Sequence, residues 1–206
     1  MDKYEKIFQD LKSRFQIARC ELNFSNNYEL IVAVILSAQC TDKRVNLITP
    51  ALFEKYPTVF DLAEADQNEL IEIIRSCGFY NNKSTNLIKM AKDVVARFNG
   101  EIPSDFDDLT SLAGVGRKTA NVVMSVAFGK NAIAVDTHVF RVANRLVIKS
   151  KTPLECELKL QKLFKENEWS DLHYFLVLFG RYVCKAKKPS CESCEFQEIC
   201  HFFKKK

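Results

Sequence analysis

The 206-residue sequence contains no hydrophobic run long enough to cross a bilayer. Its longest apolar stretch, Leu30 to Leu36, is far shorter than the roughly 20 residues that a membrane helix needs. The beginning of the chain, MDKYEKIFQD, lacks the apolar centre of a secretory signal, and no other targeting segment is seen. We therefore expect a soluble, cytoplasmic protein with no membrane partner.

Alternation of polar and apolar residues, low-complexity segments and internal repeats are also absent. Half-buried β-strands need that alternation, so its absence predicts an all-α fold. Apolar residues recur instead at helical spacing, and a hydrophobic content of 47% supports a real core. Helices are expected over 1–18, 28–39, from 41 to before Pro57, 66–77, 87–98, 104–112, 117–127 and 137–146.

Histidine is scarce, and the three present, at 138, 173 and 201, are not spaced as a metal set. Cysteine is more abundant, and four thiols near the end of the chain follow the pattern C-x6-C-x2-C-x5-C: Cys184, Cys191, Cys194 and Cys200. Intracellular thiols clustered in this way usually bind metal. The spacing alone fits tetrahedral zinc as well as a [4Fe-4S] cluster. We expect the four scattered cysteines to be small core residues: Cys20, Cys40, Cys77 and Cys156.

A glycine-punctuated turn, Gly114-Val115-Gly116, separates two expected helices. Glycine tolerates positive φ and lets the backbone approach a ligand closely. The free N–H groups of the following helix, together with Arg117, would make a phosphate site that reads no base sequence. The alternative is an αα-hairpin that uses glycine only for tightness.

Lys118 and Asp136 are the candidate reactive groups. The positive end of the helix and Arg117 both disfavour the ammonium form of Lys118, which favours an amine that can attack a sugar carbon. A lysine that only contacts phosphate is the alternative. Asp136 precedes a new helix and is expected to cap it. That role is compatible with stabilising a cationic transition state.

The segments LAGVGRKTANVV and AVDTHVFRVANR resemble the helix-hairpin-helix DNA glycosylases of the endonuclease III family. The resemblance implies that Lys118 is the nucleophile and that Asp136 assists it. Ala113 stands where the family usually has proline, which should loosen the turn slightly.

Two earlier segments also resemble motifs of this family. In Leu36 to Asp42, LSAQCTD, the resemblance implies that Gln39 enters the space left by an extruded base and that Asp42 contacts DNA. In Gly78 to Lys83, GFYNNK, Phe79 stands where leucine is common and would wedge into the opposite strand. From the residues alone, Gln39 would be a helix-end polar residue and Phe79 a core residue.

The cysteine spacing matches the cluster loop of the family, so the resemblance implies one [4Fe-4S] cluster. Between the first two of these cysteines lies a basic stretch, KAKK, and its Lys187 and Lys188 are expected beside the DNA backbone. Ordinary solvated charge is the alternative for these lysines.

The resemblance covers about Tyr28 to Cys200 and implies two helical domains with a DNA-binding cleft between them. Residues 20–130 would form a six-helix domain with the hairpin, and residues 1–19 and 131–206 an iron–sulfur cluster domain. Lys118 and Asp136 would then face each other from different domains.

The implied function is base-excision repair of oxidised pyrimidines in duplex DNA by a monomer, associated with the nucleoid if bacterial. Lys118 would expel the damaged base and cut the abasic site by β-elimination through a Schiff base. One alternative is a monofunctional or mismatch-directed glycosylase, in which Lys118 only binds phosphate. The other is a non-catalytic DNA-binding module.

Overall fold

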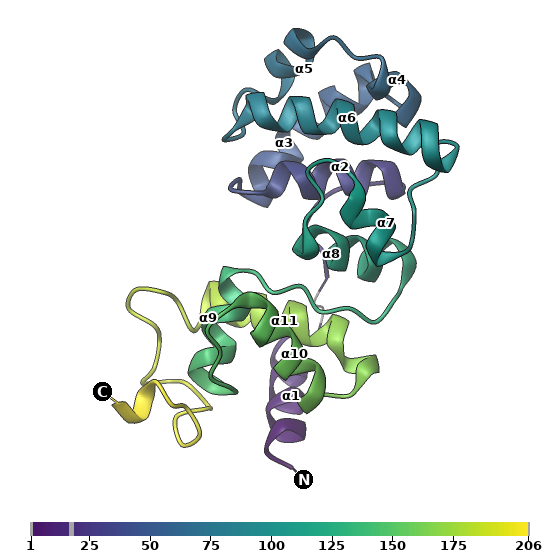
Figure 1. Ribbon diagram of the computed structural model, residues 1–206. Coiled ribbons are helices and arrows are strands. Elements are labelled where there is room, and N and C mark those ends of the chain that lie inside the picture. Colours follow the sequence, from purple (N-terminus) through teal and green to yellow (C-terminus); the bar gives the residue numbers. More distant parts are fainter. Residues whose placement is uncertain (1, 17–18, 206) are drawn as a thin grey trace. The chain divides into compact units, whose positions relative to one another are not determined.

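The computed structural model describes residues 2–16 and 19–205, and every regular element among them is a helix. The all-α prediction is therefore confirmed (Figure 1). The chain divides into two compact units. We call residues 21–130 the hairpin unit, and residues 1–20 with 131–206 the cysteine unit. That these units are separate domains stays a prediction. None of the described helices is both long and apolar enough to span a bilayer.

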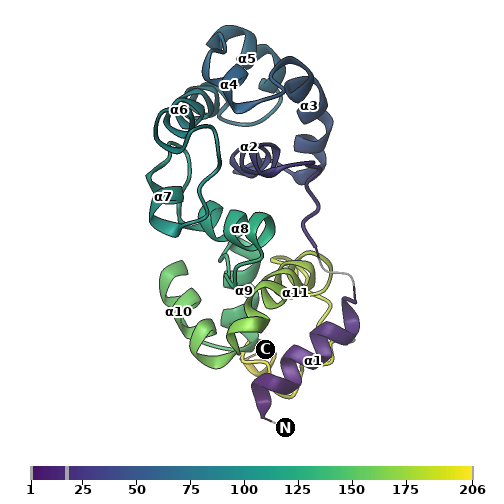
Figure 2. The same cartoon turned by 90° about the vertical axis from the view of Figure 1, so that its right-hand side faces the viewer.

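The hairpin unit is built around one buried helix. It contains α2 (Asn27–Ser37), α3 (Asp42–Lys55), α4 (Val59–Ala63), α5 (Gln67–Ile74), α6 (Tyr80–Phe98), α7 (Phe106–Ser111) and α8 (Arg117–Phe128). Tyr28 and every residue of α2 from Leu30 to Leu36 are buried, because α3, α6 and α8 all pack against this helix (Figure 2). A helix that is apolar all round is stable only in such a central position.

The cysteine unit combines the first helix with the last third of the chain. It contains α1 (Lys3–Arg14), α9 (Thr137–Leu146), α10 (Pro153–Leu163), η1 (Glu166–Glu168), α11 (Trp169–Tyr182) and η2 (Phe203–Lys205). Helix α11 packs against both α1 and α9, and α10 packs against α9. The segment between α11 and η2 has no regular helix and carries the four clustered cysteines.

Several predicted helix boundaries are wrong. Helix α1 ends at Arg14 rather than near Ala18, and residues 17–18 lie outside the described part of the chain. Helix α2 ends at Ser37 because Ala38 leaves the helical conformation, with ψ 114°, and Gln39 then adopts the left-handed conformation, with φ 56°. The helix predicted from Leu87 begins at Tyr80, and α5 ends at Ile74 rather than at Cys77. No helix was predicted at α4, α10 or α11, although Thr58 and Thr152 cap the first two of them.

Candidate active site

The turn between α7 and α8 presents its backbone rather than its side chains. Gly114 has φ 77°, and a Cβ at this position would lie 3.0 Å from the Cβ of Asn86, so both conformation and space require glycine. Val115 is buried, and its N–H donates to the carbonyl of Leu112. Gly116 is the N-cap of α8, has no capping side chain, and has nothing within 4 Å of an added Cβ. The unpaired N–H groups at the start of α8 therefore follow a residue, Gly116, with free space next to its backbone.

Lys118 lies in the first turn of α8, next to Arg117. Both side chains are exposed, and the Arg117 guanidinium lies 4.6 Å from the centre of the Phe106 ring. No carboxylate occurs in this helical turn. Among residues 2–16 and 19–205, we find no hydrogen-bond or ion-pair partner for the Lys118 ammonium group.

Asp136 is the N-cap of α9, as predicted. Its carboxylate accepts a hydrogen bond of 2.8 Å from the N–H of Val139, and its side chain is partly exposed. This bond fixes Oδ1 of the Asp136 carboxylate. Asp136 belongs to the cysteine unit and Lys118 to the hairpin unit. Their approach to each other stays a prediction.

His138 and Arg141 connect the start of α9 to α11 and to the residues that follow α11. Arg141 donates 2.9 Å to the carbonyl of Gly180 in α11 and 3.1 Å to that of Cys184, and its Nη2 lies 3.2 Å from Nδ1 of His138. A Cβ at Gly180 would lie 2.9 Å from the Cβ of His138, so the imidazole packs closely on α11. Burial lowers the pKa of His138, which Asp136 partly opposes. His138 is thus a packing residue beside Asp136.

Two further turns of the hairpin unit carry Gln39 and Phe79. Both residues adopt the left-handed conformation without being glycine, with φ 56° and φ 59°. Such strain in a non-glycine residue is commonly found at functional sites. Phe79 is 68% exposed, so the core assignment drawn from the residues alone is wrong. Gln39 is also exposed, and Asp42 is the partly exposed first residue of α3.

A buried lysine joins these two turns, and sequence reasoning missed its role. Lys83 is 6% exposed, and its Nζ donates a hydrogen bond of 2.8 Å to the carbonyl of Leu36 near the end of α2. A cation at that end of a helix is favoured by the helix dipole. A Cβ on Gly78 would lie 3.4 Å from the carbonyl oxygen of Gln39, so the two turns are in contact. In the sequence, the sole hint of a role for Lys83 is its place as the last residue of the GFYNNK motif.

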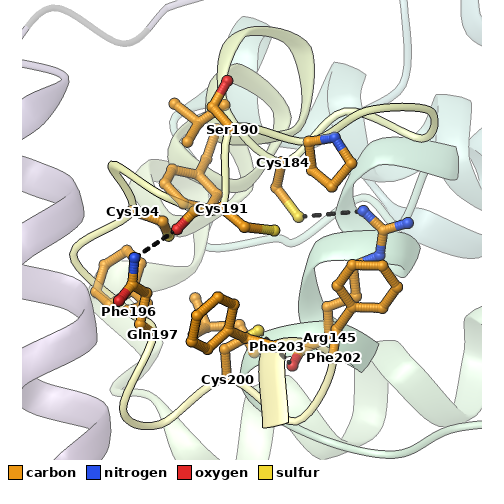
Figure 3. Close-up of a pocket in the computed structure, with 14 residues that line it drawn as sticks. Arg145, Cys184, Ser190, Cys191, Cys194, Phe196, Gln197, Cys200, Phe202 and Phe203 are labelled. Atoms are coloured by element: carbon orange, nitrogen blue, oxygen red, sulfur yellow. Dashed lines mark hydrogen bonds between the residues drawn. The ribbon is translucent and has the colours of Figure 1, made fainter. Parts of the chain in front are cut away.

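The four clustered cysteines line a single pocket of the cysteine unit (Figure 3). The other walls are mainly apolar and include Leu146, Phe179, Val183, Pro189 and Phe196. Burial raises the pKa of the Cys194 thiol. Among the described residues, no three histidine, cysteine, aspartate or glutamate side chains are placed to hold one metal ion. Of the scattered cysteines, Cys77 and Cys156 are buried as predicted, whereas Cys20 and Cys40 are partly exposed, which the prediction had wrong.

Arg145 of α9 contacts both ends of the segment from Cys184 to Cys200. Its guanidinium donates 2.8 Å to the carbonyl of Lys185, 3.3 Å to that of Ala186 and 3.5 Å to Sγ of Cys184. Its own carbonyl accepts from Sγ of Cys200, at 3.4 Å, and its guanidinium stacks 4.1 Å from the Phe202 ring centre. One residue therefore contacts the chain on both sides of the pocket.

Arg145→Lys is expected to loosen this segment, because an ammonium cannot reproduce the planar fork of donors or its stacking. We expect a loss of about 1–2 kcal/mol in the free energy of unfolding and faster proteolysis within residues 184–200. Arg75→Lys is the control, since the Arg75 side chain is 65% exposed and forms an exposed ion pair of 3.5 Å with Glu72. It should change stability by less than about 0.5 kcal/mol. Equal effects of the two variants in denaturant unfolding and limited proteolysis would contradict the role of Arg145.

Comparison with known proteins identifies the family. Residues 32–166 match the model of the HhH-GPD superfamily base excision DNA repair protein. The chain is also 48% identical over 202 residues to endonuclease III of Bacillus subtilis, covering 97% of this chain and 92% of that protein. The chain belongs to the endonuclease III family. It is accordingly an enzyme of base excision repair, a DNA glycosylase and abasic-site lyase.

Other members of the endonuclease III family agree over nearly the whole chain. The Escherichia coli endonuclease III is 44% identical over 186 residues, which cover 90% of this chain and 88% of that protein. The solved structure of a trapped endonuclease III–DNA covalent intermediate matches with a TM-score of 0.94 and 47% identity, covering 100% of this chain and 99% of that one. A thermostable thymine-DNA glycosylase shares the fold, with a TM-score of 0.89 at 24% identity.

Proposed function

We propose that this enzyme removes oxidised pyrimidines from duplex DNA and cuts the resulting abasic site with Lys118 as nucleophile and the carboxylate of Asp136 assisting it. The observation that carries the assignment is the exposed amine of Lys118 in the first turn of α8, two residues after the open Gly116 backbone and with no acid in that turn. A trapped covalent intermediate with DNA is known for a structure 47% identical to this chain, which supports a nucleophile in the same fold.

The chemistry assigns one step to each group. The neutral amine of Lys118 attacks C1′ of the extruded nucleotide, the N–C1′ bond forms, and the glycosidic bond breaks as the base leaves with its electron pair. The Asp136 carboxylate stabilises the positive charge that develops on the sugar and takes a proton from the attacking amine. Opening of the sugar ring gives a Schiff base, and β-elimination then breaks the C–O bond on the 3′ side.

DNA binding is divided between backbone and side chains. The turn of Gly114, Val115 and Gly116, with Arg117, would hold a phosphate through its amides and one cation, which requires no base sequence. Gln39 would occupy the space left by the extruded nucleotide, and Phe79 would wedge into the opposite strand. Both side chains are exposed, and the two turns that carry them contact each other.

Three further residues would contact the DNA: Asp42, Lys187 and Lys188. Asp42, at the first turn of α3, lies three residues after Gln39. Lys187 and Lys188 are exposed between the first two clustered cysteines and would contact phosphate.

The chemistry of the four-cysteine pocket fits one [4Fe-4S] cluster. A single tetrahedral zinc ion with bonds of about 2.3 Å would need its sulfurs within about 4 Å of one another. The thiols are not gathered as a single-ion site, yet all four line one largely apolar pocket. Four thiolates around a larger group are the ligand set of a cubic cluster. The cluster would be held by four thiolates, those of Cys184, Cys191, Cys194 and Cys200. Its bonds to these cysteines would order the segment that contains Lys187 and Lys188.

Cys194→Ser is expected to remove the visible absorbance of the purified protein and to cost about 4 kcal/mol or more of stability, because a ligand of the cluster is lost. Cys156→Ser is the matched control, since Cys156 is a fully buried thiol outside the pocket. It should lower the melting temperature but keep the colour. A colourless wild type that contains zinc would contradict the cluster assignment.

The function is tested on two duplexes, one with an oxidised pyrimidine and one with an abasic site, by measuring base release and strand cleavage separately. We expect both on the first duplex and cleavage on the second. Base release without cleavage would support the monofunctional alternative. Binding of DNA with neither reaction would support the non-catalytic module.

A further inference from the structure

Two thiols of the hairpin unit lie almost in contact, beside the turns that carry Gln39 and Phe79. Sγ of Cys40 donates a hydrogen bond to Sγ of Cys77, with 3.3 Å between the sulfurs. Cys40 follows Gln39 directly, and Cys77 precedes Phe79 by two residues. The pair is separate from the cysteine pocket, which lies in the other unit. The catalytic proposal uses neither thiol.

The two thiols differ in access. Cys77 is 1% exposed, whereas Cys40 is partly exposed at the surface. Burial, and then the hydrogen bond from Cys40, raise the pKa of Cys77 to about 12. Cys40 is therefore the thiol that a dissolved oxidant reaches first, and Cys77 is the partner that resolves the product.

The backbone around the pair is held in place. The N–H of Cys40 donates to the carbonyl of Ser37, and that of Cys77 donates to Ile74. Lys83 fixes the end of α2 from the start of α6, and Gly78 packs on the carbonyl of Gln39. A disulfide needs sulfurs about 2.05 Å apart, so the pair closes by a movement of little more than 1 Å.

We propose that Cys40 and Cys77 are a redox modification site, in which a reversible disulfide ties the Gln39 turn to the Phe79 turn and slows DNA processing. The proposal rests on the assignment of these two turns to nucleotide extrusion. The bond fixes the relative positions of two left-handed turns that must both adapt to the duplex. A small misplacement of positioning groups lowers the rate strongly.

The oxidant is a low-molecular-weight disulfide, such as oxidised glutathione. The Cys40 thiolate attacks one glutathione sulfur, the glutathione S–S bond breaks, and the first glutathione leaves as a thiolate. The Cys77 thiol then attacks Sγ of Cys40 and gives up its proton as the S–S bond forms, and the second glutathione leaves. The protein pair loses two electrons, glutathione disulfide gains them, and the two thiol protons end on the two glutathione thiols.

The whole protein is treated with oxidised glutathione, alkylated, digested with trypsin and mapped by mass spectrometry. We expect a link between peptides 20–43 and 76–83, the products of cleavage after Arg19, Lys43, Arg75 and Lys83. Peptide 20–43 also contains Cys20, so Cys20→Ser is the matched control and should keep the link. Cys40→Ser and Cys77→Ser should lose it. Cys40 is partly exposed, so Cys40→Ser decides the result if Cys77→Ser does not fold.

Base release is measured on the same samples. We expect oxidised wild type to release the base about tenfold more slowly than reduced wild type and to recover with dithiothreitol, and Cys40→Ser to be insensitive to the oxidant. Absence of the link, its loss in Cys20→Ser, or a link without any change in rate would each overturn the proposal. Reduced protein that releases no base would instead contradict the proposed function, and the peptide map would still decide whether the disulfide forms.

Discussion

Replacing Lys118 with alanine is expected to lower strand cleavage at an abasic site by at least about a thousandfold, because no other amine is assigned to form the Schiff base. The exposed position of Lys118 in the first turn of α8 means that its loss leaves no buried unpaired group, so stability should hold. The measurement is borohydride trapping on duplexes with an abasic site or an oxidised pyrimidine. Wild type should give a covalent protein–DNA band on both, and the variant on neither.

Lys118→Arg separates the nucleophile from the phosphate contact. Arginine keeps the positive charge near Arg117 but has no amine that attacks at neutral pH. DNA affinity should stay within a few-fold of wild type while trapping and cleavage are lost. If Lys118→Arg cleaves at a wild-type rate, Lys118 is a phosphate contact and the nucleophile lies elsewhere.

Asp136→Asn is expected to reduce base release by about a hundredfold to a thousandfold while leaving the fold intact. An asparagine oxygen can accept the hydrogen bond from the N–H of Val139 that the carboxylate accepts at 2.8 Å, so the cap of α9 is kept. The negative charge that stabilises the sugar cation is lost. Single-turnover base release and thermal unfolding, measured on the same preparation, check both parts.

Asp136→Ala provides the comparison for this residue. It removes the charge and the cap together, and should cost about 1 kcal/mol more in the free energy of unfolding than Asp136→Asn. Equal activities of the two variants, with unequal stabilities, would show that charge governs the reaction and the cap only the helix. Wild-type activity in Asp136→Asn would reduce the role of this residue to the cap.

The features predicted well from the sequence are those determined by neighbours along the chain. The turn at Gly114 and the start of α8 follow from glycine spacing and apolar periodicity, and Asp136 caps α9 because its carboxylate reaches an amide three residues on. The all-α class follows in the same way, because helical periodicity is local. The catalytic roles of Lys118 and Asp136 rest instead on family resemblance and stay proposals.

The features that were missed depend on contacts between distant segments. The exposure of Phe79 could not be inferred from its apolar character, since a left-handed turn after α5 directs it outward. The bond from Lys83 to Leu36 joins residues 47 positions apart. Cys40 and Cys77 are 37 positions apart, and no pattern in the sequence brings their sulfurs to 3.3 Å.

The turn at Gly114, Val115 and Gly116 would mislead an alanine scan. Val115→Ala would register as a loss of core packing, because the side chain is buried, and Gly114→Ala as a clash with Asn86. Neither variant removes an amide, which is the group proposed to hold the phosphate. Every amino acid except proline carries a backbone N–H, so this contact persists while the side chains of the turn vary. Replacing single amides by esters through chemical synthesis would expose it directly.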